Sequence, residues 1–141
     1  KDYLSMFYGV ISKKDLCLRY VNLGSSCAFY AHSNKEFKEL PTQGKALSQK
    51  TKWSLQEDGE LHLLPNDRLV LLSDGFVENV GGSQAVCDLL SQNRHKEAKD
   101  SLNELVFRVK STLNEEDMPD QDCSVVVLDI EPNTLRLAQS G

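Results

Sequence analysis

At 141 residues, the chain is long enough for one domain with a hydrophobic core and too short for two. Its composition, 40% hydrophobic and 26% charged, is ordinary for a globular protein, and no apolar stretch approaches the roughly 20 residues of a membrane span. A net charge of -5 argues against a nucleic-acid partner, because no excess of cationic side chains is available to neutralise phosphates. The first residue is Lys1 rather than Met, and no signal peptide follows it, so we expect a fragment of a longer protein.

The cysteines and histidines form no recognisable zinc or disulfide pattern. The four cysteines are Cys17, Cys27, Cys87 and Cys123. Without a C-x-x-C pair, and with apolar neighbours around each, they are expected to be reduced core cysteines of a cytoplasmic protein. The histidines His32, His62 and His95 are equally dispersed, so surface or strand-face positions are expected for them.

Strand patterns dominate the first half of the chain. The predicted strands are residues 3–11, 16–21, 28–31, 53–55, 61–63 and 68–72. Neighbouring strands are expected to be antiparallel, and Asp58-Gly59 suits a two-residue hairpin turn between the fourth and the fifth. The polar connector 36–49 indicates a loop. The last of these strands, RLVLL, is apolar on both faces, which indicates a central position in a sheet.

Helical periodicity follows in the second half. Ser83 can cap a helix over residues 83–92, and residues 98–113 carry a clear amphipathic stripe. A last buried strand is predicted at 124–130. Strands followed by helices and a strand indicate an α+β fold, with the helices on one face of mainly antiparallel strands.

The clearest chemical signal is at the end of the central strand. This strand delivers Asp74 to its C-terminal end, where the carboxylate is held rigidly yet exposed, and Gly75 lets the backbone turn sharply. Oxygen donors placed in this way suit a hard divalent cation such as Mg²⁺ or Mn²⁺. Taken alone, Ser-Asp-Gly is also common as simple turn chemistry, which is the structural alternative.

Four segments in a fixed order point to one family. They are FYGV at 7–10, YVNLG at 20–24, NDRLVLLSDGFVE at 66–78 and DCSVVVL at 122–128. The third resembles the hallmark G-D-[RL]-[LV]-hydrophobics-[ST]-D-G-[LV]-x-E of the SpoIIE-like branch of the PPM (type 2C) protein serine/threonine phosphatases. Asn66 stands where that pattern has glycine, and Phe76 takes the aliphatic position. The other three resemble the family's first hairpin strand, its Y-V-N-A-G segment and its closing D-D-x-T strand, although Ser25-Ser26 replaces the usual residues after the glycine.

This resemblance implies a fold and an activity. Residues 1–131 would be the C-terminal portion of a PPM-type domain, a fragment of a four-layer α-β-β-α sandwich, and residues 132–141 a tail or linker. The activity implied is that of a metal-dependent protein serine/threonine phosphatase, in which two Mn²⁺ or Mg²⁺ ions activate a water for attack on phosphorus. The substrate would be a phosphorylated regulatory protein of bacterial signalling, such as an anti-sigma-factor antagonist.

The same resemblance implies roles for particular residues. Asp74 would be the catalytic carboxylate and a metal ligand, with Gly75 and Asp122 as further metal ligands. Asp74 should therefore lie close to the segment 120–122, at neighbouring strand ends. Glu78 would order the following loop; a solvated surface acid is the equally weighted alternative.

Two departures from the family pattern leave other hypotheses open. Gln121 stands where the first aspartate of D-D-x-T ligates metal, and a neutral amide is a weaker ligand, although Asp120 or Asp122 could take that place. The family's G-D-x-x-G-H-G segment is absent from the chain, so the chain alone is expected to show little activity. The alternatives are a catalytically degenerate regulatory or binding module and an unrelated α+β binding domain.

Overall fold

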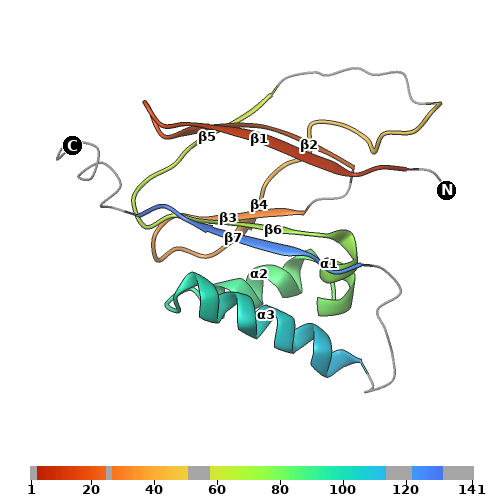
Figure 1. Ribbon diagram of the computed structural model, residues 1–141, viewed down its shortest axis with the longest axis vertical. Coiled ribbons are helices and arrows are strands. Elements are labelled where there is room, and N and C mark those ends of the chain that lie inside the picture. The colour runs from red at the N-terminus through yellow and green to blue at the C-terminus, as the bar shows by residue number, and fades with distance from the viewer. Residues whose placement is uncertain (1–2, 25–26, 51–57, 114–121, 132–141) are drawn as a thin grey trace.

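Two antiparallel sheets lie face to face, and three helices cover the far side of one of them (Figure 1). The computed structural model describes residues 3–24, 27–50, 58–113 and 122–131. Its strands are β1 (Met6–Ser12), β2 (Cys17–Leu23), β3 (Ala28–Ala31), β4 (Lys38–Glu39), β5 (Gly59–His62), β6 (Arg68–Leu72) and β7 (Val125–Asp129). Its helices are α1 (Asp74–Val80), α2 (Ser83–Gln92) and α3 (Ala98–Thr112). The α+β prediction, with helices on one face of antiparallel sheets, is confirmed.

The outer sheet has the strand order β1-β2-β5. Alternate residues of β2, Leu18 and Tyr20, are buried against the inner sheet, and the Tyr20 ring stacks on Phe7 with centroids 5.6 Å apart. Gly59 pairs with Tyr20 inside β5, where a Cβ atom would lie 2.2 Å from the Tyr20 ring. The predicted turn at Asp58-Gly59 is therefore wrong for Gly59, whose missing side chain leaves room for that ring. The expected partner strand 53–55 lies outside the described residues.

The inner sheet has the order β4-β3-β6-β7 and contacts two hydrophobic cores. Phe29 of β3 and Val70 of β6 face the helices and are both fully buried, whereas Tyr30 and Leu69 face the outer sheet. The central position predicted for residues 68–72 is thus confirmed. The connector 36–49 is not wholly a loop, because its residues 38–39 pair with β3 as the edge strand β4.

Helices α2 and α3 match the predicted ranges, whereas α1 was not expected. Its seven residues follow directly from β6, too short a stretch for a helical period to be recognised in the sequence. Phe76 and Val77 bury one side of α1, and Gly81 ends it in a left-handed conformation with φ of 113°. Of the described helices, none combines the length and apolarity that crossing a bilayer requires.

An ion pair with a buried arginine joins β6 to β7. The Arg68 guanidinium, 3% exposed, donates to both carboxylate oxygens of Asp129 at 2.6 and 2.9 Å and to the Lys96 carbonyl at 2.8 Å. Just before Arg68, Asn66 has a φ of 68°. The departure from the family's glycine is explained here, because asparagine is among the few side chains that tolerate this left-handed conformation.

Candidate metal centre

Asp74 and Asp122 lie at neighbouring strand ends. Strands β6 and β7 are antiparallel, and Leu72, the last residue of β6, pairs with Val125, the first of β7. Asp74 comes two residues after Leu72 in the chain, and Asp122 comes three residues before Val125. The predicted proximity of Asp74 to this segment is therefore confirmed at Asp122, and residues 120–121 lie outside the described residues.

Ser73 joins the two segments through three hydrogen bonds. Its backbone N–H donates to the Ser124 carbonyl at 3.0 Å, and its hydroxyl accepts from the Ser124 N–H at 2.9 Å. The same hydroxyl donates to the Asp122 carbonyl at 3.0 Å. Sequence reasoning gave Ser73 no role, although the hydroxyl-bearing position of the [ST]-D-G motif was the available signal. Because Ser73 immediately precedes Asp74, these hydrogen bonds fix the position of the Asp74 backbone relative to Asp122.

Asp74 begins helix α1, and its charge affects the neighbouring thiol of Cys27. Asp74 is the first residue of α1, where the exposed N–H groups favour a negative charge. Burial, followed by the charge of Asp74, raises the pKa of the Cys27 thiol. Cys27 therefore lies near the Asp74 carboxylate, and its thiol stays protonated at neutral pH. A helix-stabilising acid and a metal ligand are compatible roles for one half-buried aspartate.

Gly75 and Glu78 are placed less favourably for the roles implied by the family pattern. The Gly75 carbonyl lies inside α1 and accepts a hydrogen bond from Asn79 Nδ2 at 2.6 Å, so the helix already uses this oxygen. The geometry thus does not favour Gly75 as a ligand. Asn79 Nδ2 also lies 3.8 Å from Cys123 Sγ, which adds a second link between α1 and the start of β7. Glu78 is exposed on α1, as a solvated acid would be.

The donor set fits a hard divalent cation. Mg²⁺ and Mn²⁺ take oxygen ligands, and Mg²⁺ in particular is often held by one or two protein carboxylates with water completing the shell. Asp74 and Asp122 supply two carboxylates from adjacent strand ends, and Asp122 is exposed to solvent. A pair of cations at fixed spacing would need further carboxylates beyond these two.

Comparison with known proteins first defines the class of fold. The chain is similar to a Bacillus subtilis SpoIIE phosphatase domain presoaked with Mn (17% identity, TM-score 0.69, 92% of this chain and 58% of that one). It is also similar to the SiaA-PP2C domain of Pseudomonas aeruginosa (16%, 0.74, 90% and 52%) and to the Mycobacterium tuberculosis serine/threonine phosphatase PstP/Ppp (14%, 0.66, 90% and 60%). The chain therefore has the PP2C phosphatase fold and spans between 52% and 60% of the length of these structures.

A match to a protein-family model identifies the family of the chain. The model of stage II sporulation protein E (SpoIIE) matches residues 1–131, and the chain belongs to this family. The resemblance to the SpoIIE-like branch of the PPM phosphatases is thereby confirmed. No curated protein matches the chain.

Proposed function

We propose that this chain supplies part of the metal centre of a protein serine/threonine phosphatase, with Asp74 as the catalytic carboxylate and a metal ligand and Asp122 as a second ligand. The observation that carries the proposal is the Ser73 bridge, which holds the Asp74 and Asp122 segments together at one sheet edge. Membership of the SpoIIE family supports it, since the relatives of known structure include phosphatase domains. Gly75 is the least supported of the three ligands implied by the resemblance, because its carbonyl is bonded within α1.

The residues of the chain would act by position and charge. Bound Mn²⁺ or Mg²⁺ would supply an acidified water and neutralise charge on the phosphoryl oxygens. Asp74 would hold the cation, and Ser73 would keep the Asp74 backbone beside Asp122. Asn79 would stabilise the first turn of α1 through its hydrogen bond to the Gly75 carbonyl. In the overall reaction, a water oxygen forms the new P–O bond, the bond to the seryl or threonyl oxygen breaks, and that oxygen receives a proton.

The substrate class follows from the family alone. We propose a phosphorylated regulatory protein of bacterial signalling, such as an anti-sigma-factor antagonist, and a cytoplasmic location. A two-cation centre needs more carboxylates than Asp74 and Asp122 offer, so the remaining ligands would come from parts of the longer domain that the chain does not span. The chain tested alone should then show little Mn²⁺-dependent hydrolysis.

A catalytically degenerate regulatory module is the second candidate. Gln121 favours it, because this neutral amide occupies the position at which the family pattern has a ligating aspartate. The fold would persist in such a protein, since the Ser73 bridge and the buried core do not depend on a cation. The two candidates differ in the activity of the longer protein that includes the upstream part of the domain.

The test is Mn²⁺-dependent hydrolysis of a phosphoserine protein by that longer protein. Asp74→Asn should lower the rate by about 100-fold or more, since it removes a ligand charge. Asp100→Asn is the matched control, because Asp100 is an exposed aspartate in the first turn of α3, and it should leave the rate unchanged. Full activity in Asp74→Asn would refute the proposal. An inactive parent that gains activity with Gln121→Asp would establish the degenerate module instead.

A further inference from the structure

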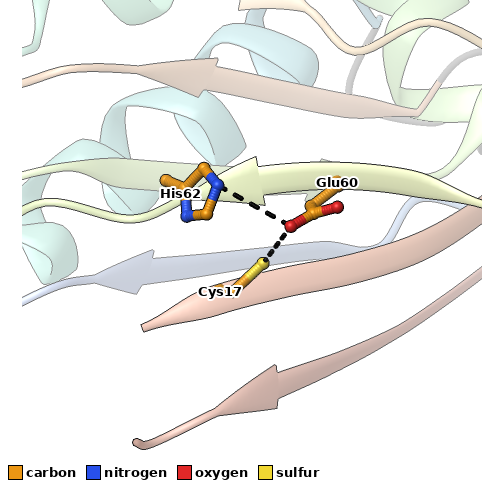
Figure 2. Close-up of side chains that lie close together, drawn as sticks. All are labelled: Cys17, Glu60 and His62. Carbon is orange, nitrogen blue, oxygen red and sulfur yellow. Dashed lines mark hydrogen bonds and ion pairs between the residues drawn. The ribbon is translucent and has the colours of Figure 1, made fainter. Parts of the chain in front are cut away.

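A thiol, a carboxylate and an imidazole meet on the outward face of the outer sheet, far from Asp74. Cys17 opens β2 and pairs directly with His62, the last residue of β5. Glu60 precedes His62 by two residues, so both side chains leave the same face of β5. Figure 2 shows the three side chains close together, with dashed lines from one Glu60 oxygen to His62 and to Cys17.

The distances among these three side chains are short. Cys17 Sγ lies 3.4 Å from Glu60 Oε1, and His62 Nε2 lies 3.7 Å from the same oxygen. All three candidate ligand atoms lie within 4.8 Å of one another. The Cys17 residue is only 3% exposed, whereas the side chains of His62 and Glu60 are 74% and 53% exposed. One ligand is thus fixed by packing, and the other two are open to an arriving ion.

We propose that Cys17, Glu60 and His62 form a site for a borderline-soft divalent cation of the Zn²⁺ class. Tetrahedral Zn²⁺ bonds at about 2.0–2.3 Å place its ligand atoms roughly 3.3–3.8 Å apart. Two of the three separations already lie in that range, and the exposed His62 ring can turn to close the third. Three protein ligands would leave the fourth position to water.

The chemistry of the ligands separates this site from the one at Asp74. A thiolate and an imidazole select Zn²⁺ or Co²⁺ over Mg²⁺, which prefers a shell of oxygens alone. In the absence of an ion, burial and the hydrogen bond to Glu60 raise the pKa of the Cys17 thiol, so the bound cation would displace a proton. That thiol–carboxylate hydrogen bond is the resting state of the cluster.

The location indicates what the ion would do. Cys17 is the first residue of β2 and Leu23 is the last, and a strand of seven residues is about 20 Å long. Because Leu23 leads toward Cys27 and Asp74, the cluster lies at the far end of the sheet from the proposed phosphatase centre. A cation here would cross-link β2 to β5, an edge strand of four residues. The inference is independent of the phosphatase proposal.

The experiment is a Co²⁺ titration of the 141-residue chain, followed by absorption. A thiolate–cobalt charge-transfer band in the near ultraviolet should saturate at one equivalent, and Zn²⁺ but not Mg²⁺ should remove it. Cys17→Ser should abolish the band, and Glu60→Gln and His62→Gln should each weaken binding by at least about 10-fold. Cys87→Ser and His95→Gln are matched controls, because neither residue belongs to the cluster, and they should behave as wild type.

Two outcomes would overturn the site. One is the absence of a thiolate–cobalt band in the wild-type chain, and the other is a band that survives Cys17→Ser or is unaffected by His62→Gln. His62 is exposed, so His62→Gln should fold normally and keeps the test decisive even if Cys17→Ser were unstable. Asp74→Asn should leave the thiolate–cobalt band unchanged, because that band reports the Cys17 ligand alone, and this separates a failure of this site from a failure of the phosphatase centre.

Discussion

The two sheets of this protein use their faces differently. Strand β6 of the inner sheet is covered on both sides, by helices and by the outer sheet, and four of its five residues are buried. Strand β1 of the outer sheet has no buried residue, and its Tyr8 and Val10 are 62% and 54% exposed. Strand β6 is therefore packed on both faces, whereas the outward face of β1 is open to solvent.

This contrast explains how each candidate site is built. At Asp74, a rigid buried strand and the short helix α1 present a carboxylate at the rim of the core. At Cys17, the pairing of β2 with β5 brings the three candidate ligands together on the outward face of the sheet. Of these, the Cys17 thiol is held in place by its burial. Substitutions should therefore cost far more at the buried positions of the inner sheet than on the outward face of the outer sheet.

The largest effect is expected from truncating a core aromatic. Phe29→Ala should lower the free energy of unfolding by about 4 kcal/mol, because Phe29 is fully buried and its removal leaves a cavity. Tyr8→Ala, a comparable truncation on the outer face, should cost no more than about 0.5 kcal/mol. Urea unfolding of both variants measures the difference. Equal costs would mean that the outer face of this chain is packed against something else, such as a second copy.

A smaller effect is expected at the ion pair between Arg68 and Asp129. Asp129→Asn should destabilise the fold by about 3 kcal/mol, because it leaves the buried guanidinium without its counter-charge. Glu104→Gln is the matched control, since both side chains of the Lys96–Glu104 pair at 2.9 Å are partly exposed, at 31% and 45%, and the pair should be worth less than about 1 kcal/mol. If the two variants proved equally stable by thermal unfolding, Arg68 would have found water or another acceptor.

Much of the fold could be predicted where the pattern was local and long. The 15-residue helix α3 carries enough turns for its apolar stripe to be recognised, and the four residues of β6 after Arg68 are all apolar. Helix α1 could not be predicted because seven residues barely complete two turns. Gly59 could not be placed either, since its role depends on the Tyr20 ring, which lies 39 positions earlier in the chain.

The same distinction applies to the sites. The position of Asp74 at the end of a strand could be predicted because that strand and the family motif are contiguous, but the sharp turn expected at Gly75 is instead the first turn of α1. The role of Asp74 as a ligand stays a prediction. The [ST]-D-G motif marked Ser73 as a hydroxyl position, but not its partners, because Asp122 and Ser124 lie at the end of the neighbouring strand about 50 positions later in the chain. The Cys17 cluster was missed for a stronger reason: 43 residues separate Cys17 from Glu60, and only the register of β2 with β5 brings them together. The spacing of cysteines and histidines along the sequence does not reveal how β2 and β5 pair.

The smallest effect is expected for Asp74 itself. As the first residue of α1, its carboxylate gains about 0.5 kcal/mol from the helix N-terminus. Asp74→Asn should therefore change the free energy of unfolding of the chain by no more than about 0.5 kcal/mol, the same range as Asp100→Asn in α3. Urea unfolding without added metal measures both. A loss of several kcal/mol in Asp74→Asn alone would make this aspartate a structural residue, and a loss of phosphatase activity in that variant could no longer be attributed to a missing ligand.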